Sequence, residues 1–279
     1  MKKQKDHYVP EFYLKRWSQN NPNQKLFSAR YFPDTKKIQW TPHAPSGTGY
    51  ERDLYGEIEE LFFKPLDNDA CNVLSKLESG HPITPIKLDL GEKDHNRWAV
   101  FIIGFMVRIP GKIEFIREVF KSEGLPDSVA TNQIPKIVQN ERAIKDLRSL
   151  TWIFARVNTN LELITCDNPL IFKPNNLSHP DCMIVLPMSP KHFFLATNKE
   201  NISRLEKDPR KMVMNINTEI IRNADKRIYA KSRHSIEDAF IVKHWLTKKN
   251  LTTPYTGSPI NPAPGEPPPL AQRKVCFLT

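Results

Sequence analysis

Cysteine is scarce in this chain. The 279 residues contain four, and none forms a Cys-x-x-Cys pair. They are Cys71, Cys166, Cys182 and Cys276. Such isolated cysteines indicate neither a zinc ribbon nor a disulfide framework. This usage fits a reducing environment, and we expect a cytoplasmic protein.

Long apolar runs are also missing. The longest, WAVFIIGFMV at residues 98–107, falls well short of the about 20 residues that a membrane-spanning helix needs. The first residues are polar and charged, unlike the apolar centre of a signal peptide. We therefore expect no membrane partner, and we expect residues 98–107 to form a buried helix.

Three kinds of catalytic motif are absent. The sequence has no Gly-x-x-x-x-Gly-Lys-Ser/Thr, no Gly-x-Gly-x-x-Gly after a strand and no Gly-x-Ser-x-Gly. These absences argue against a P-loop ATPase, a Rossmann oxidoreductase and an α/β-hydrolase. No remaining motif names a reaction by its spacing alone.

Positive charge is in excess. Lys and Arg number 41 against 31 Asp and Glu, which gives a formal charge of +10. Such an excess attracts nucleic acid or another polyanion. The basic residues are scattered without a long run, so a solvated basic surface is the alternative.

The first half of the chain has mainly helical patterns. Residues 25–40 are the exception, because two apolar stretches flank PDTKK and predict a hairpin. Apolar residues at spacings of three and four predict helices at 51–80, 94–108 and 112–120. In the first of these, Pro65 should introduce a kink and Gly80 should end the helix. Residues 129–150 resemble a polar loop followed by an amphipathic helix at 136–150.

From residue 151 the pattern changes to that of strands. Two β-rich stretches flank NTN within 151–172, and two more flank MSPK within 183–197, so each pair predicts a hairpin. Helices should follow at 212–230 and 236–249. The fold class is therefore α+β, with a helical N-terminal half packed on an antiparallel sheet of about four strands and with C-terminal helices. We expect one domain over residues 1–250 and a Pro-rich, extended or disordered tail over 251–279.

The opening stretch KDHYVPEFYLKRW has the first candidate site residue, His7. Pro10 fixes the backbone just after it, and an imidazole suits proton transfer near neutral pH. The alternative is that His7 only pins the terminus through a hydrogen bond. Tyr8 is better explained by packing, whereas Lys15 and Arg16 could be presented to phosphate.

Asp167 follows a predicted strand in the sequence CDNP. Such a side chain often binds the next backbone amides and stiffens a turn, but strand ends also present catalytic carboxylates. Its neighbour Asn168 offers an amide for a substrate oxygen or a metal-bound water. Asn217, on a later predicted helix, should bind a neighbouring loop, and the Asp-Asn-Pro turn is our choice.

Arg108 ends an apolar helix, where a guanidinium needs an anion. We predict a partner among five carboxylates, which are Glu57, Glu59, Asp67, Asp69 and Asp167. A buried structural ion pair, with Glu59 as one candidate, explains Arg108 without a functional role. The functional alternative places Arg108 and a carboxylate in one pocket with His7, where Arg108 binds an anionic substrate oxygen.

Several motifs together resemble a known bacterial family. They are HYVPEFYLKRW, Arg108 followed by Pro110, TCDNPLIF, LPMSP and NTEIIRNADKRIYA. In this order they resemble the domain of unknown function 4238 over roughly residues 5–232. Some members resemble genes of mobile-element and phage-defence neighbourhoods, so the resemblance implies nucleic-acid or nucleotide chemistry.

These observations favour a phosphodiester-directed hydrolase, a nuclease-like effector. His7 would be the general acid or base, Arg108 would stabilise phosphoryl charge, and Asp167 would orient His7 or hold a divalent cation such as Mg²⁺ or Mn²⁺. The residues expected to bind substrate are Tyr8, Lys15, Arg16, Glu59, Asn168 and Asn217. The alternative is a non-catalytic module that binds nucleic acid or a nucleotide. A third interpretation is a structural protein in which these polar residues form hydrogen bonds in the core. The sequence leaves the oligomeric state open.

Overall fold

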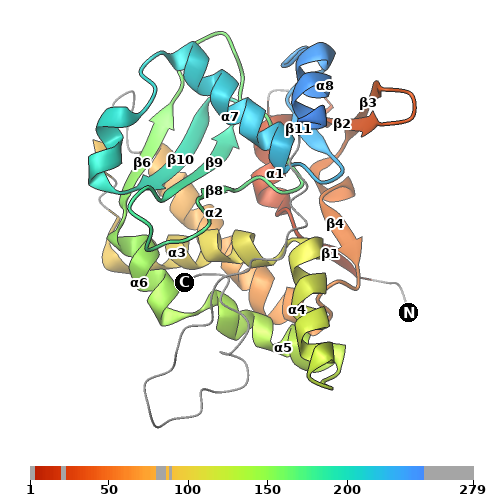
Figure 1. Cartoon of the computed structure of the whole chain (residues 1–279), viewed down its shortest axis with the longest axis vertical. Helices are drawn as coiled ribbons and strands as arrows, with labels where there is room; N and C mark the ends of the chain where they lie inside the picture. Colours follow the sequence, from red (N-terminus) through yellow and green to blue (C-terminus); the bar gives the residue numbers. More distant parts are fainter. Residues whose placement is uncertain (1–3, 20–22, 80–85, 88–89, 248–279) are drawn as a thin grey trace.

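The computed structural model describes residues 4–19, 23–79, 86–87 and 90–247. This part of the chain folds into antiparallel sheets and runs of helices, so the predicted α+β class is confirmed. Figure 1 shows α3 to α6 gathered below the two larger sheets, and α7 and α8 above them. The predicted tail at 251–279 and Gly80 lie outside the described residues.

The larger sheet has five strands in the order β5-β6-β10-β9-β8. They are β5 (Ile86–Lys87), β6 (Thr151–Arg156), β8 (Ile171–Lys173), β9 (Met183–Ser189) and β10 (His192–Thr197). Strands β9 and β10 form the hairpin that the sequence predicts around MSPK. β9 is an inner strand between β10 and β8, and all of its residues after Met183 are buried.

The second sheet has four strands in the order β3-β2-β11-β7. They are β2 (Leu26–Phe32), β3 (Lys37–His43), β7 (Thr165–Cys166) and β11 (Ile228–Ala230). The predicted hairpin at 25–40 is confirmed as β2 and β3. A separate two-stranded ribbon pairs β1 (Lys5–His7) with β4 (Tyr50–Arg52).

The predicted hairpin around NTN is wrong, because β6 lies in the five-stranded sheet and β7 in the four-stranded sheet. Between them the chain runs beside the β9–β10 turn. Val157 N–H donates to the carbonyl of Lys191 at 2.8 Å, and Leu163 N–H donates to that of Pro190 at 2.8 Å. Alternation predicted extended segments correctly here, but it does not say which strand each one pairs with.

The lower helices are α2 (Lys64–Ser79), α3 (Glu92–Val107), α4 (Pro110–Ser122), α5 (Asp127–Val138) and α6 (Glu141–Ser149). The predicted polar loop is helix α5, and the single helix predicted at 136–150 is divided before Glu141. The division has a local cause, since the Asn140 side chain accepts a hydrogen bond from Ala143 N–H and so begins α6. A π-helical turn, η2 (Glu59–Phe63), precedes α2, so the irregularity expected at Pro65 lies just before it.

The upper helices are α7 (Pro209–Asn223) and α8 (Asp238–Leu246). The helix predicted at 212–230 therefore ends at Asn223, and its last three residues are strand β11. Apolar residues of α7 such as Val213 and Ile220 share a core with residues of both larger sheets. In the described residues no helix is long and apolar enough to cross a membrane.

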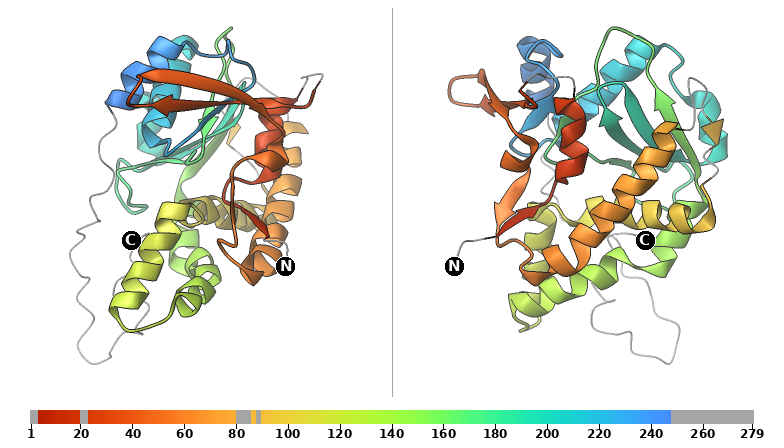
Figure 2. Two further views of the ribbon diagram at one scale, coloured as in Figure 1. Left: turned by 90° about the vertical axis from the view of Figure 1, so that its right-hand side faces the viewer. Right: turned by 180° about the vertical axis from the view of Figure 1, so that it is seen from behind.

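The opening helix, α1 (Glu11–Ser18), joins the two larger sheets, and it is drawn in red in Figure 2. The Tyr13 hydroxyl lies 2.7 Å from Thr165 Oγ1 in one sheet and donates to the Pro187 carbonyl in the other at 2.6 Å. Trp17 Nε1 donates to the carbonyl of Leu163. Tyr13 and Trp17 are both 0% exposed. The aromatic cluster near the N-terminus is thus docked in the core, as predicted.

Candidate functional site

Arg108 is 0% exposed and has the carboxylate partner that the sequence predicts. That partner is Asp67 on α2. Arg108 Nη2 lies 2.8 Å from Asp67 Oδ1, and Nη1 lies 3.3 Å from Oδ2. The guanidinium also lies 4.6 Å from the centre of the Phe63 ring and 5.4 Å from that of Phe105. These contacts with the protein itself favour a structural role for Arg108.

Two further carboxylates are buried near this ion pair. Asp6 Oδ2 accepts from Tyr55 N–H at 2.7 Å, and Glu59 Oε1 accepts from His7 N–H at 3.3 Å. Burial raises the pKa of Glu59 to about 7, although the His7 amide and the Arg108 charge both lower it. We call Asp6, Glu59, Asp67 and Arg108 the buried charge cluster.

Asp167 binds the chain that leads into β11. Its carboxylate accepts hydrogen bonds from three consecutive backbone N–H groups, at 2.7 Å from Asp225, 2.6 Å from Lys226 and 2.8 Å from Arg227. Burial raises the pKa of Asp167 to about 6 despite these three bonds. The carboxylate therefore fixes a turn that joins distant parts of the sequence, which favours its structural interpretation.

The two candidate amides differ. Asn217 is buried, accepting from Ile164 N–H at 3.0 Å and donating to the Glu162 carbonyl at 2.9 Å. Asn217 therefore fixes the segment before β7 and does not bind the Asp-Asn-Pro turn. The residue just after that turn, Leu170, accepts a hydrogen bond at its carbonyl from the Asn223 side chain. Asn168 follows Asp167 in the turn and is half-buried.

His7 is half-buried beside the Tyr50 ring, with 5.6 Å between the ring centres. Burial lowers its pKa. Its Nε2 is buried and has no hydrogen-bond partner among the described residues. Within the residues that the structure describes, the side chains of His7, Arg108 and Asp167 make no direct contact with one another. Glu59 accepts from the His7 amide and lies near Arg108, whereas Asp167 binds the backbone before β11.

The remaining candidates lie on and before α1. Lys15 is exposed and pairs with Glu11 at 3.0 Å, whereas Arg16 is half-buried on the same helix. Tyr8 is buried close to Tyr229 and Asp167, and its pKa is raised mainly by burial. Tyr8 of the opening motif is therefore near enough to Asp167 for an electrostatic interaction.

One face of the four-stranded sheet has several exposed polar and charged side chains. Strands β2 and β3 pair Arg30 with Gln39 and Phe32 with Lys37, so these four side chains share a face. Arg227 joins that face, donating to Ser28 Oγ at 3.3 Å and lying 3.5 Å from His43 Nε2. We call this the open sheet face, formed by Arg30, Phe32, Lys37, Gln39, Thr41, His43 and Arg227. Each of these residues is exposed or half-buried.

The outer end of this face combines positive charge with an aromatic ring. The Arg30 guanidinium lies 5.1 Å from the centre of the Phe32 ring. Phe32 and Lys37 also line an open hollow of about 440 Å³ along the edge strand β3, together with Trp40 and Arg233. Figure 1 shows the β2–β3 hairpin projecting from the body of the protein.

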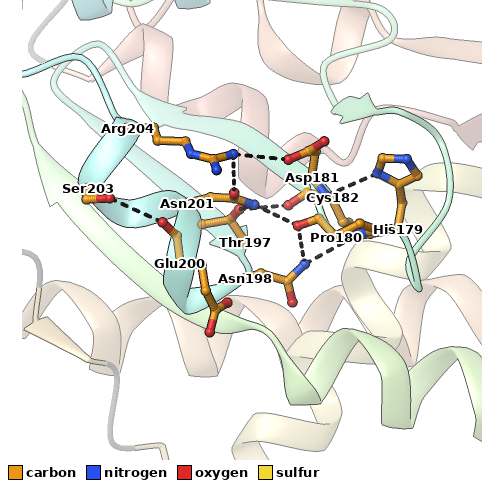
Figure 3. Close-up of polar contacts among 10 residues, drawn as sticks. All are labelled: His179, Pro180, Asp181, Cys182, Thr197, Asn198, Glu200, Asn201, Ser203 and Arg204. Atoms are coloured by element: carbon orange, nitrogen blue, oxygen red, sulfur yellow. Dashed lines mark hydrogen bonds and ion pairs between the residues drawn. The ribbon is translucent and has the colours of Figure 1, made fainter.

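A second hollow, of about 380 Å³, lies between the approach to β9 and the 3₁₀ helix η3 (Lys199–Arg204). Its polar side chains bind one another, as Figure 3 shows. Asn198 Nδ2 donates to the carbonyls of His179 and Pro180, and Asn201 Nδ2 donates to that of Pro180. Arg204 Nη1 lies 3.3 Å from Asp181 Oδ1. These contacts tie a loop to a helix, so we interpret this hollow as structural.

Within the described ranges, no group of three or more His, Cys, Asp or Glu residues is arranged to hold a metal ion. Arg30, Phe32, Lys37 and Arg227 are not among the site residues predicted from the sequence. The alternation within the predicted hairpin at 25–40 contained a usable signal, because it places Arg30 and Phe32 on the same face.

Fold and surface together define an α+β protein with a cationic, aromatic sheet face. The chain matches a family described as protein of unknown function (DUF4238) over residues 5–234, and it belongs to that family. No curated protein and no solved structure gives a significant match.

Proposed function

We propose that this protein binds single-stranded nucleic acid along the open sheet face. The observation that carries the proposal is the grouping of Arg30 and Lys37 beside the half-buried ring of Phe32, with Arg227 farther along the same face. Cationic side chains attract the phosphate backbone, and an aromatic ring stacks with an unpaired base. In a duplex the bases are already stacked, so the ring favours a single strand.

The charges on this face are available for such contacts. Arg30 and Lys37 are exposed, and neither forms an ion pair with a carboxylate in the part of the chain described here. Arg227 is half-buried and held by Ser28 and His43, so it needs little ordering when a ligand binds. The net charge of +10 adds a long-range attraction for polyanions.

Hydrolysis centred on His7 is the weaker proposal. It requires Arg108 for phosphoryl charge and Asp167 to orient His7, but these two side chains bind Asp67 and the backbone before β11. Binding needs no such centre. The non-catalytic alternative therefore accounts for more of the geometry.

The test is fluorescence anisotropy with labelled DNA and RNA single strands of about 20 nucleotides, which exceeds the site size of most single-strand-binding folds. The matching duplex is the comparison. We expect saturable binding that prefers a single strand. Phe32→Ala should weaken it by about 5-fold to 150-fold, corresponding to the ~1–3 kcal/mol of one base–aromatic stack. No binding to either strand type would refute the proposal.

The same reactions, repeated with Mg²⁺ or Mn²⁺ and resolved on a denaturing gel, separate binding from hydrolysis. We expect intact oligonucleotides. Cleavage by the wild-type protein that His7→Gln abolishes would restore the hydrolase as the leading function.

A further inference from the structure

A second cationic group lies on the five-stranded sheet, at the end of β6 and beside the β9–β10 turn. Arg156 and His192 are direct partners across β6 and β10, so their side chains share a face. Phe154, two residues before Arg156, stacks on His192 with 5.6 Å between ring centres and 14° between ring planes. The imidazole therefore stacks on a fixed ring and shares a face of the sheet with Arg156.

Ser189 fixes the orientation of the imidazole. Its Oγ lies 2.9 Å from His192 Nδ1 and accepts from the backbone N–H groups of Lys191 at 3.2 Å and His192 at 3.1 Å. Since those two donors occupy the oxygen's lone pairs, the hydroxyl proton is left to donate to Nδ1. In the neutral ring the proton then sits on Nε2, which becomes a hydrogen-bond donor facing away from Ser189.

Two arginines influence the protonation of His192. Burial is the main cause that lowers its pKa, and the charges of Arg156 and Arg16 lower it further. Arg156 is exposed and has no carboxylate partner within the described chain. Arg16 comes from α1, so two separate elements contribute cations to one imidazole. An anion would relieve this repulsion and would accept from several N–H groups at once.

We propose that Arg156 and the Nε2 of His192 bind a phosphate group. Phosphate suits the set because it presents several acceptor oxygens in different directions and carries between one and two negative charges at neutral pH, whereas a carboxylate has two oxygens and one charge. The ligand class is inorganic phosphate or a small phosphorylated molecule. This site lies on a different sheet from the open sheet face, so the inference does not depend on single-strand binding.

The test is a nuclear magnetic resonance titration of the His192 ring with inorganic phosphate, and separately with adenosine 5′-monophosphate. We expect saturable shifts and an increase in the pKa of His192, because a bound dianion favours the imidazolium. Saturation by both probes indicates a site for the phosphate group itself. Saturation by only the nucleotide identifies a phosphorylated molecule as the ligand, and saturation by only the inorganic ion identifies free phosphate.

Arg156→Gln should weaken phosphate binding about tenfold or more, since it removes a charged donor. Arg210→Gln is the matched control, because it removes an exposed arginine on the first turn of α7 and should leave the affinity unchanged. Ser189→Ala should weaken binding by a smaller factor and keep both arginines. The proposal is overturned by the absence of saturable shifts with either probe, or by equal affinities of wild type and Arg156→Gln.

Discussion

Two arginines of this protein each lie over a phenylalanine ring, and they have opposite surroundings. Arg108 is 0% exposed and bound to Asp67, and its guanidinium lies 4.6 Å from the centre of the Phe63 ring. Arg30 lies 5.1 Å from the Phe32 ring and is exposed. The local contact is similar in both pairs, so burial and the presence of a carboxylate determine the role. We infer that Arg108 stabilises the fold and that Arg30 binds a ligand.

The largest effect should come from breaking the buried pair. Arg108→Leu leaves Asp67 without its cation in a largely apolar setting, and we expect a loss of about 3–5 kcal/mol of unfolding free energy. Urea denaturation measures this loss. The matched change Arg30→Leu on the open sheet face should alter stability by less than about 0.5 kcal/mol. Similar losses in the two variants would contradict the structural assignment of Arg108.

The buried charge cluster should also make stability depend on pH. Burial raises the pKa of Glu59 from 4.5 to about 7. Because the folded state holds this proton more tightly than the unfolded state, the contribution of Glu59 is complete below pH 4.5 and is lost as the pH rises through about 7.

We therefore expect Glu59→Gln to be more stable than wild type at pH 8 by roughly 1–3 kcal/mol, with little difference at acid pH. Chemical denaturation at several pH values gives the comparison. Part of the slope should persist in the variant, since the pKa of Asp167 is also raised, to about 6. If the unfolding free energy of Glu59→Gln varied with pH as that of wild type does, ionisation of Glu59 would cost the folded state little free energy.

Tyr13→Phe tests the junction between the two larger sheets. It removes the hydroxyl that contacts Thr165 and Pro187 and leaves those buried groups without this partner. We expect a loss of about 1–3 kcal/mol, measured as a lower denaturation midpoint. Tyr31→Phe is a control with a buried tyrosine at the β2–β3 hairpin and should cost less. A larger loss of stability in Tyr31→Phe than in Tyr13→Phe would mean that the hydrogen bonds of the Tyr13 hydroxyl do not stabilise the junction between the two sheets.

The smallest effect on stability should come from the open sheet face. The double variant Arg30→Gln/Lys37→Gln removes two exposed charges and no ion pair that the structure shows, so its melting temperature should match that of wild type. A clear decrease would indicate that these residues support the fold and would weaken their assignment to ligand binding.

The sequence predicted those parts of the fold that depend on local pattern. The helix ending near Arg108, the hairpins at 25–40 and 183–197, and the need of Arg108 for a carboxylate all follow from periodicity and from the cost of burying a charge. Strand pairing over long distances did not follow. Strand β7 has two residues and pairs with β11, more than sixty positions later, so no local signal marks it.

The candidate site was harder to predict for the same reason. His7 and Asp167 belong to distinctive motifs, but only the folded chain shows that Asp167 binds three amides and that Arg108 binds Asp67. Arg227 reaches the open sheet face because β11 pairs with β2, almost two hundred residues away in sequence. A surface assembled in this way cannot be recognised from residue spacing.

The most direct test of single-strand binding by the open sheet face is the salt dependence of affinity. Wild type and Arg30→Gln/Lys37→Gln are titrated with a labelled single strand from about 50 mM to about 200 mM salt, and Lys207→Gln/Arg210→Gln is the control of equal charge. We expect the double variant to bind more weakly and its log–log slope to be shallower by about 1.4, at ~0.7 for each lost phosphate contact. The control should keep the wild-type slope. Equal slopes for all three proteins would contradict binding at this face.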